Sequence, residues 1–131
     1  MILLHDLGET VTGDIPKPQK KLDSTYDMNE DSVMRSLLLK GTYPQMTNLN
    51  SYYDIWDEWK AQETINSKIA KDLDTLQAIY QFCVYYNAYP DNFSEERKIN
   101  WLLEYNDLKT DIGRELYRKL ISDNPKFPFV R

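Results

Sequence analysis

The sequence predicts an all-α fold, and three observations support this prediction. The chain of 131 residues contains only 4 glycines, whereas Leu, Lys and Glu, which favour helices, are frequent. Apolar residues recur at spacings of three and four, as on one face of a helix. No segment alternates apolar and polar side chains as a half-buried strand would. The length fits a single helical domain over residues 1–131.

The first element, from Met1 to about Thr10, is expected to be the end of a helix, with apolar contacts from Ile2, Leu3, Leu4 and Leu7. A helix this short needs tertiary support, so we expect the chain to begin inside an element that is longer in related proteins. Residues from Gly13 to about Asp27 are predicted to form a loop, because Pro16 and Pro18 interrupt helical hydrogen bonding.

Two helices are predicted next. The first runs from about Asn29 to Lys40, ends at Gly41 as a candidate stop, and has an apolar side made of Val33, Leu37 and Leu38. The second runs from about Asn50 to Glu63 and carries a stripe of Tyr52, Ile55, Trp56 and Trp59. A core role for the two tryptophans is favoured over the stacking of a nucleobase.

The longest helical pattern runs from Asn66 or Ser67 to about Asn87. Its expected inward face consists of Ile69, Leu73, Leu76, Ile79, Tyr80, Cys83 and Val84. Pro90 breaks the chain, and Ser94 is a candidate cap for a helix that contains Ile99, Leu102 and Leu103. A surface or dimer contact is favoured over a ligand platform for Tyr85, Tyr86 and Tyr89.

The last predicted helix spans about Thr110 to Ile121. The tail, about residues 123–131, is expected to be extended, with Phe127 and Phe129 as anchors.

Composition excludes several classes of function. The net charge of −5, from 21 acidic and 16 basic residues, argues against binding long nucleic acid, which favours a basic surface. No segment is apolar enough for a membrane span. The single Cys83 indicates a core residue in a reducing compartment, so a cytoplasmic location is expected. The predicted loop contains a lysine cluster, Lys17, Lys20 and Lys21. We favour solvent-exposed side chains here over contact with a phosphate.

The only histidine lies beside an acid near the start of the chain. His5 and Asp6 offer one imidazole nitrogen and one carboxylate oxygen, a mixture that suits Mn, Fe, Co, Ni, Mg or Zn. Glu9, one helical turn beyond His5, is a candidate for orienting or deprotonating a water molecule. Asp14 follows a glycine and is a candidate for binding substrate or tuning the site, although Gly-Asp is also an ordinary turn pair.

A further acid is needed to complete a metal site, and Asp74 is the candidate. It lies in a largely apolar stretch, where an unpaired carboxylate would be costly unless a metal ion or a base neutralises it. Asp72 is the competitor, but it points to a different side and, next to Lys71, is expected to be solvated.

These segments resemble the HD-domain metal-dependent phosphohydrolases, most closely their 5'-deoxynucleotidase-like branch. The resemblance rests on Leu4–Glu9, Val11–Ile15, Ile55–Trp59, Thr64 and Lys71–Asp74. It implies an HD-domain-like helical bundle that lacks the first helices. It also implies that a divalent metal ion is bound by His5, Asp6 and Asp74, that Glu9 activates water, and that Asp14 assists substrate binding.

The chain departs from the family pattern in two places. A further metal-binding histidine and a phosphate-binding arginine would lie upstream of the His-Asp pair, where this chain has no residues, and Gln77 stands where relatives often carry glutamate. We expect either an exposed apolar patch around Ile2 and Leu3 or its burial against another copy or a complementing chain.

The expected function is therefore hydrolysis of a small phosphorylated substrate, such as a (deoxy)nucleoside 5'-monophosphate. The alternative is a catalytically impaired HD-fold fragment that acts as an oligomeric or partner-binding helical module. A third hypothesis is that the chain is one piece of a larger enzyme.

Overall fold

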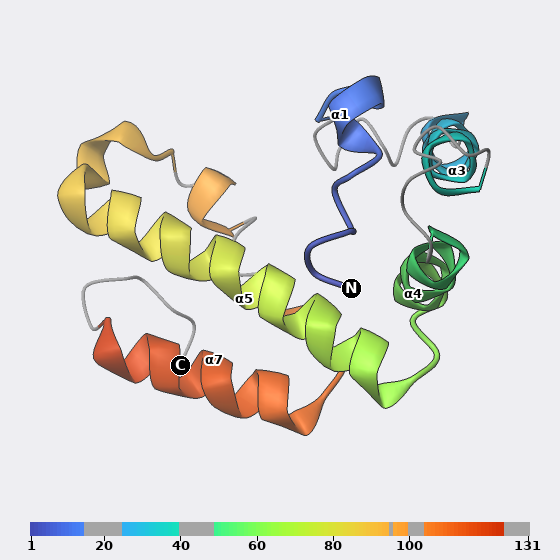
Figure 1. Ribbon diagram of the computed structural model, residues 1–131. Coiled ribbons are helices and arrows are strands. Elements are labelled where there is room, and N and C mark those ends of the chain that lie inside the picture. The colour runs from blue at the N-terminus through green and yellow to red at the C-terminus, as the bar shows by residue number, and fades with distance from the viewer. Residues whose placement is uncertain (15–24, 40–48, 95, 100–103, 125–131) are drawn as a thin grey trace. The chain divides into compact units, whose positions relative to one another are not determined.

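The structure is a computed structural model that describes residues 1–14, 25–39, 49–94, 96–99 and 104–124 (Figure 1). The described elements are helices, in the order α1 (Glu9–Thr12), α3 (Thr25–Leu38), α4 (Leu49–Ala61), α5 (Ile65–Ala88), the 3-10 helices η1 (Pro90–Asn92) and η2 (Glu104–Asp107), and α7 (Asp111–Asp123). Within these ranges there is no strand, so the prediction of an all-α fold is confirmed.

The chain divides into two compact units, Met1–Ala61 and Gln62–Arg131. Each is described here by itself, and the prediction that residues 1–131 form one domain stays a prediction. Several sequence predictions lie outside the described residues: the lysine cluster, the prolines of the first loop, Gly41, Leu102, Leu103 and the extended tail. None of the helices in the described ranges is both long and apolar enough to cross a membrane.

In the first unit, the segment before α1 is a series of turns instead of the predicted end of a helix. Most of its hydrogen bonds join residues three apart instead of four; Leu4 N and His5 N, for example, donate to the same Met1 carbonyl. Gly8 is buried in this segment. A Cβ at this position would lie only 3.0 Å from Glu30 Cγ of α3. A glycine therefore allows the turns to pack closely against α3.

Helices α3 and α4 form the core of the first unit. Met34 and Leu38 of α3 are buried, and so are Trp56 and Trp59 of α4, which confirms the core role predicted for the two tryptophans. The predicted stripe was wrong at its start, since Tyr52 is 38% exposed and its neighbour Tyr53 is buried.

A polar network joins the same two helices around Asp31. This carboxylate accepts a hydrogen bond of 2.7 Å from Arg35 Nε and one of 3.2 Å from the Tyr53 hydroxyl of α4. Lys60 Nζ lies 3.9 Å away. The hydrogen bond from Arg35 is the main reason why the pKa of Asp31 is lowered.

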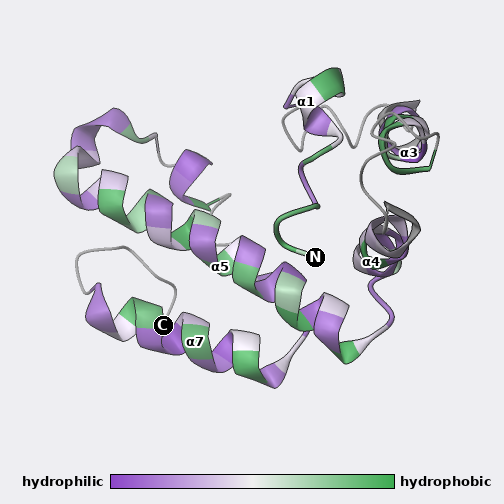
Figure 2. Cartoon of the chain, viewed as in Figure 1, coloured by the Kyte–Doolittle hydropathy of each residue, from purple (hydrophilic) through white to green (hydrophobic). Residues whose placement is uncertain are grey.

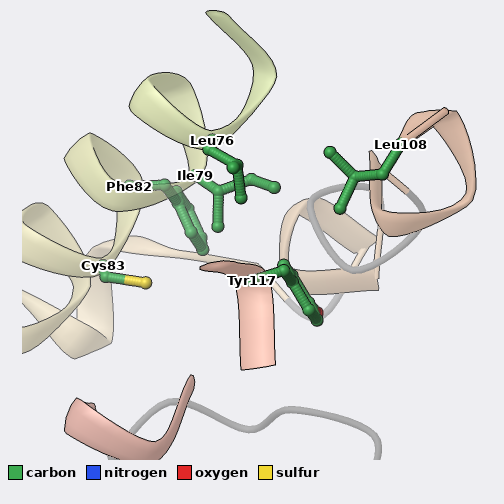
Figure 3. Packing of buried hydrophobic residues seen from close by; sticks show 6 residues of the cluster. All are labelled: Leu76, Ile79, Phe82, Cys83, Leu108 and Tyr117. Carbon is green, nitrogen blue, oxygen red and sulfur yellow. The ribbon is translucent and has the colours of Figure 1, made fainter. Parts of the chain in front are cut away.

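In the second unit, α5 packs along α7 (Figure 1). Both helices begin within two residues of their predicted starts, and each has a threonine cap that the sequence analysis did not identify: Thr64 Oγ1 accepts from Ser67 N at 3.1 Å, and Thr110 Oγ1 accepts from Gly113 N at 3.0 Å. The core between them consists of Leu76, Ile79, Phe82, Cys83, Leu108 and Tyr117 (Figure 3). Burial raises the pKa of the Cys83 thiol to about 11, as expected for a core cysteine.

The inward face predicted for α5 was only partly correct. Leu76, Ile79 and Cys83 are buried, but Leu73, Tyr80 and Val84 are exposed by 41%, 54% and 41%. Apolar and polar residues alternate along this helix (Figure 2), so the sequence offers more than one apolar stripe. The stripe that faces α7 includes Phe82, which the prediction omitted.

The connection between α5 and α7 agrees with its prediction where it is described. Residues 96–99 are helical, and the Ser94 hydroxyl accepts from Arg97 N at 3.3 Å, so Ser94 is the predicted cap. Tyr86 packs against Phe93 with ring centroids 6.1 Å apart, whereas Tyr85 and Tyr89 are exposed.

Candidate functional site

The His5–Asp6 pair forms the start of the candidate site, in the turns before α1. The Nδ1 atom of His5 donates a hydrogen bond to the Ile2 carbonyl. On the opposite side of the ring, His5 Nε2 lies 3.1 Å from Asp6 Oδ1, and the two side chains are 16% and 62% exposed. The imidazole is therefore well covered, while the carboxylate remains accessible to a ligand.

This geometry suits an ion bound by nitrogen and oxygen. With Nδ1–H bonded to the Ile2 carbonyl, the neutral form of His5 offers its Nε2 lone pair to an ion, as in many metal-binding histidines, whereas the protonated form pairs Nε2–H with Asp6 Oδ1. Two donors at right angles around an ion, each at roughly 2.1 Å, are about 3 Å apart. The separation of 3.1 Å between Nε2 and Oδ1 fits that arrangement.

An aromatic ring covers one side of His5. The imidazole and the indole of Trp59 have centroids 4.9 Å apart and planes inclined by 55°. Trp59 belongs to α4 and is itself buried. The orientation of the imidazole is thus defined by a hydrogen bond on its edge and by an indole beside it.

Glu9 is the first residue of α1 and is half-buried. The sequence placed His5 and Glu9 one turn apart on a single helix, but helix α1 begins only at Glu9, and the prediction of a continuous helix was wrong. The backbone still turns tightly here, since Glu9 N donates to the Asp6 carbonyl at 3.0 Å.

Asp14 is exposed and follows α1 directly. The preceding Gly13 has φ 80°, a backbone conformation that favours glycine. The Gly-Asp pair thus ends the short helix, and the function of Asp14 stays a prediction.

The structure places Asp74 on α5, in the second unit. Lys71 Nζ lies 2.9 Å from its Oδ2 atom, and the Asp74 side chain is 28% exposed. Its charge is therefore balanced by a base, which is one of the two possibilities inferred from the sequence. The structure brings His5 and Asp6 together, and the convergence of Asp74 with them stays a prediction. Within each unit, the described residues include no group of three His, Cys, Asp or Glu side chains that could hold a metal ion.

Asp72 is not the solvated residue that the sequence predicted. It is 2% exposed, and its carboxylate accepts bonds of 2.8 Å from Lys109 N, 2.8 Å from Thr110 N and 2.6 Å from Thr110 Oγ1. These donors satisfy a buried charge that would otherwise be costly. Asp72 therefore anchors the start of α7, and Lys71 pairs with Asp74 instead.

Sequence reasoning missed two contributions to these surroundings. It assigned Trp59 to the core without its contact with His5, and it gave no role to the Ile2 carbonyl. Helical periodicity identifies a buried face but does not identify which distant side chain lies against it. The local indications of the site in the sequence were the adjacent His5 and Asp6, with Glu9 and Asp14 shortly after them.

Comparison with known proteins supports the family resemblance that the sequence motifs indicated. A family model described as an HD domain matches residues 1–114. A 5'-deoxynucleotidase HDDC2 of Xenopus laevis is 30% identical over 86 residues, which make up 65% of this chain and 41% of that protein. A protein of the same description from Danio rerio is 29% identical over 84 residues, 62% of this chain and 39% of that protein. The chain thus spans about two fifths of the length of these curated relatives. No solved structure matches the chain.

Proposed function

Because the chain belongs to the HD-domain family, we propose that it acts in the metal-dependent hydrolysis of phosphomonoesters, with (deoxy)nucleoside 5'-monophosphates as the substrate class. The observation that carries the proposal is the His5–Asp6 pair, whose Nε2 and Oδ1 atoms are spaced as two ligands of one ion. The similarity to proteins described as 5'-deoxynucleotidases supports the substrate class.

In this proposal, His5, Asp6 and Asp74 hold a divalent ion of Mn, Co, Mg, Fe, Ni or Zn. Such an ion would polarise the phosphoryl oxygens and lower the pKa of water. His5 binds through Nε2, while its Nδ1–H remains bonded to the Ile2 carbonyl. Asp74 must exchange its ion pair with Lys71 for the ion.

Glu9 and Asp14 are the proposed catalytic residues. Glu9 accepts a proton from the attacking water as the water oxygen bonds to phosphorus. The ester P–O bond breaks, and the nucleoside leaves as an alcohol that takes up a proton. Asp14 assists by accepting a hydrogen bond from the substrate. The products are inorganic phosphate and a nucleoside.

Phosphate release from deoxynucleoside 5'-monophosphates in Mn²⁺ or Co²⁺ tests this proposal. We expect Glu9→Gln to reduce the rate by about 100- to 10,000-fold, the range for loss of a general base, while ion binding is retained. Glu63→Gln changes an exposed glutamate and is the matched control, with an unchanged rate. Equal rates in Glu9→Gln and the unmodified chain would refute the catalytic assignment.

The complete absence of metal-dependent phosphate release would instead favour the alternative, a helical module that acts through an oligomer or a partner. Exposed apolar side chains at Ile2 (44%) and Leu3 (96%) are compatible with such a contact. Light scattering after gel filtration distinguishes a homo-oligomer or a complex with a complementing chain from a monomer. A cytoplasmic location remains part of the proposal.

A further inference from the structure

We propose that Trp59 is a positioning residue for His5, holding the imidazole in the orientation that directs Nε2 toward Asp6. Only one consequence of this inference rests on the proposed function, namely that the orientation favours the binding of a metal ion. The orientation itself is a property of the chain without any ligand.

The ring contact carries the inference. The centroid separation of 4.9 Å and the inclination of 55° lie within the range of favourable aromatic pairs, about 4.5–7 Å apart. Trp59 is 9% exposed, so packing within the unit fixes the indole. A fixed indole against one face of the imidazole restricts rotation of the smaller ring.

His5 needs such support because of where it lies. It belongs to the turns before α1 and not to a regular helix, so no helical backbone limits its side-chain rotamers. The hydrogen bond from Nδ1 to the Ile2 carbonyl by itself leaves the ring able to pivot about that bond. The indole adds a further restraint on the direction that Nε2 faces, which is toward Asp6. Precise ligand orientation of this kind generally depends on the groups behind the ligand.

The other described tryptophan of α4 provides a contrast. Trp56 is 2% exposed, its ring lies 5.7 Å from that of Tyr53, and Lys60 Nζ lies 5.2 Å from its centroid. These contacts lie within α4 and do not involve His5. Trp56→Leu is therefore a matched control, because it removes a more deeply buried indole from the same helix without removing the ring beside His5.

Nuclear magnetic resonance of the imidazole tests the ring contact that carries the inference. His5 is the only histidine, so every histidine ring signal belongs to it. We expect the Hδ2 and Hε1 resonances to be displaced by the indole ring current in the full chain. Trp59→Leu should abolish the displacement, while Trp59→Phe should keep part of it and Trp56→Leu should keep it. Identical His5 resonances in Trp59→Leu and the unmodified chain would overturn the inference.

Metal affinity supplies a second readout. In calorimetric titrations with Co²⁺, we expect Trp59→Leu to weaken binding by about 10- to 100-fold, the usual loss when a group that orients a ligand is removed. Trp59→Phe should recover most of the affinity.

Equal affinity in Trp59→Leu and the unmodified chain would overturn the proposed role. Failure of the unmodified chain to bind Co²⁺ would refute the proposed function, and the resonance comparison would still decide whether the indole of Trp59 lies against His5, the contact from which the inference is argued. If Trp56→Leu fails to fold, the comparison of Trp59→Leu with Trp59→Phe remains decisive.

Discussion

At the scale of single residues, two aspartates on one helix have opposite surroundings. Asp72 is buried and accepts three hydrogen bonds from Lys109 and Thr110, whereas Asp74 is partly exposed and paired with Lys71. The sequence identified Asp74 as the candidate ligand but misjudged Asp72. Its partners are more than 35 positions away and leave no local pattern in the sequence.

The surroundings of Asp72 explain why residue 113 is a glycine. A Cβ at this position would lie less than 3 Å from three atoms of Asp72. We expect Gly113→Ala to lower the free energy of unfolding by about 1–3 kcal/mol, as overpacked substitutions do. Glu115→Ala, at an exposed position of α7, should change it by less than about 0.5 kcal/mol. Denaturant titration measures both, and an unchanged stability in Gly113→Ala would argue against the described contact.

At the scale of elements, the sequence predicted long, capped helices best. Helix α5 begins at Ile65 and α7 at Asp111, each within two residues of its predicted start, because each has a clear apolar period. The start of α3 was placed four residues too late, since its first turn, Thr25–Met28, carries little apolar pattern. The turns around His5 were mistaken for a helix because a short apolar run does not distinguish the two.

The pairing of α3 with α4 depends on charge as well as on apolar packing. Because the pKa of Asp31 is lowered in the folded chain, the ionised carboxylate stabilises the folded state. This stabilisation is fully present at pH values above the ordinary pKa of an aspartate. It is lost as the pH falls through the lowered pKa. We expect Asp31→Asn to be less stable than the unmodified chain at neutral pH. The difference should shrink below about pH 4. Thermal unfolding at several pH values measures it, and a difference that grows on acidification would contradict this role.

At the scale of the whole molecule, the sequence supplied the site residues but not their assembly. The His-Asp pair, Glu9 and Asp14 lie within ten positions of one another, so their motif could be read directly. Asp74 belongs to the second unit, and the proposal that it shares an ion with His5 and Asp6 depends on tertiary packing that no sequence period encodes. The central claim is that these two parts of the chain together bind one catalytic ion.

Calorimetric titration with Mn²⁺ or Co²⁺ tests this claim most directly, using the unmodified chain, His5→Ala and Asp74→Asn. Asp91→Asn is the control, because Asp91 is exposed in η1 and has no role in the proposed site. We expect one ion per chain, a loss of affinity of at least about tenfold in each site variant, and no change in Asp91→Asn. Unchanged affinity in Asp74→Asn, or no binding by the unmodified chain, would contradict the account.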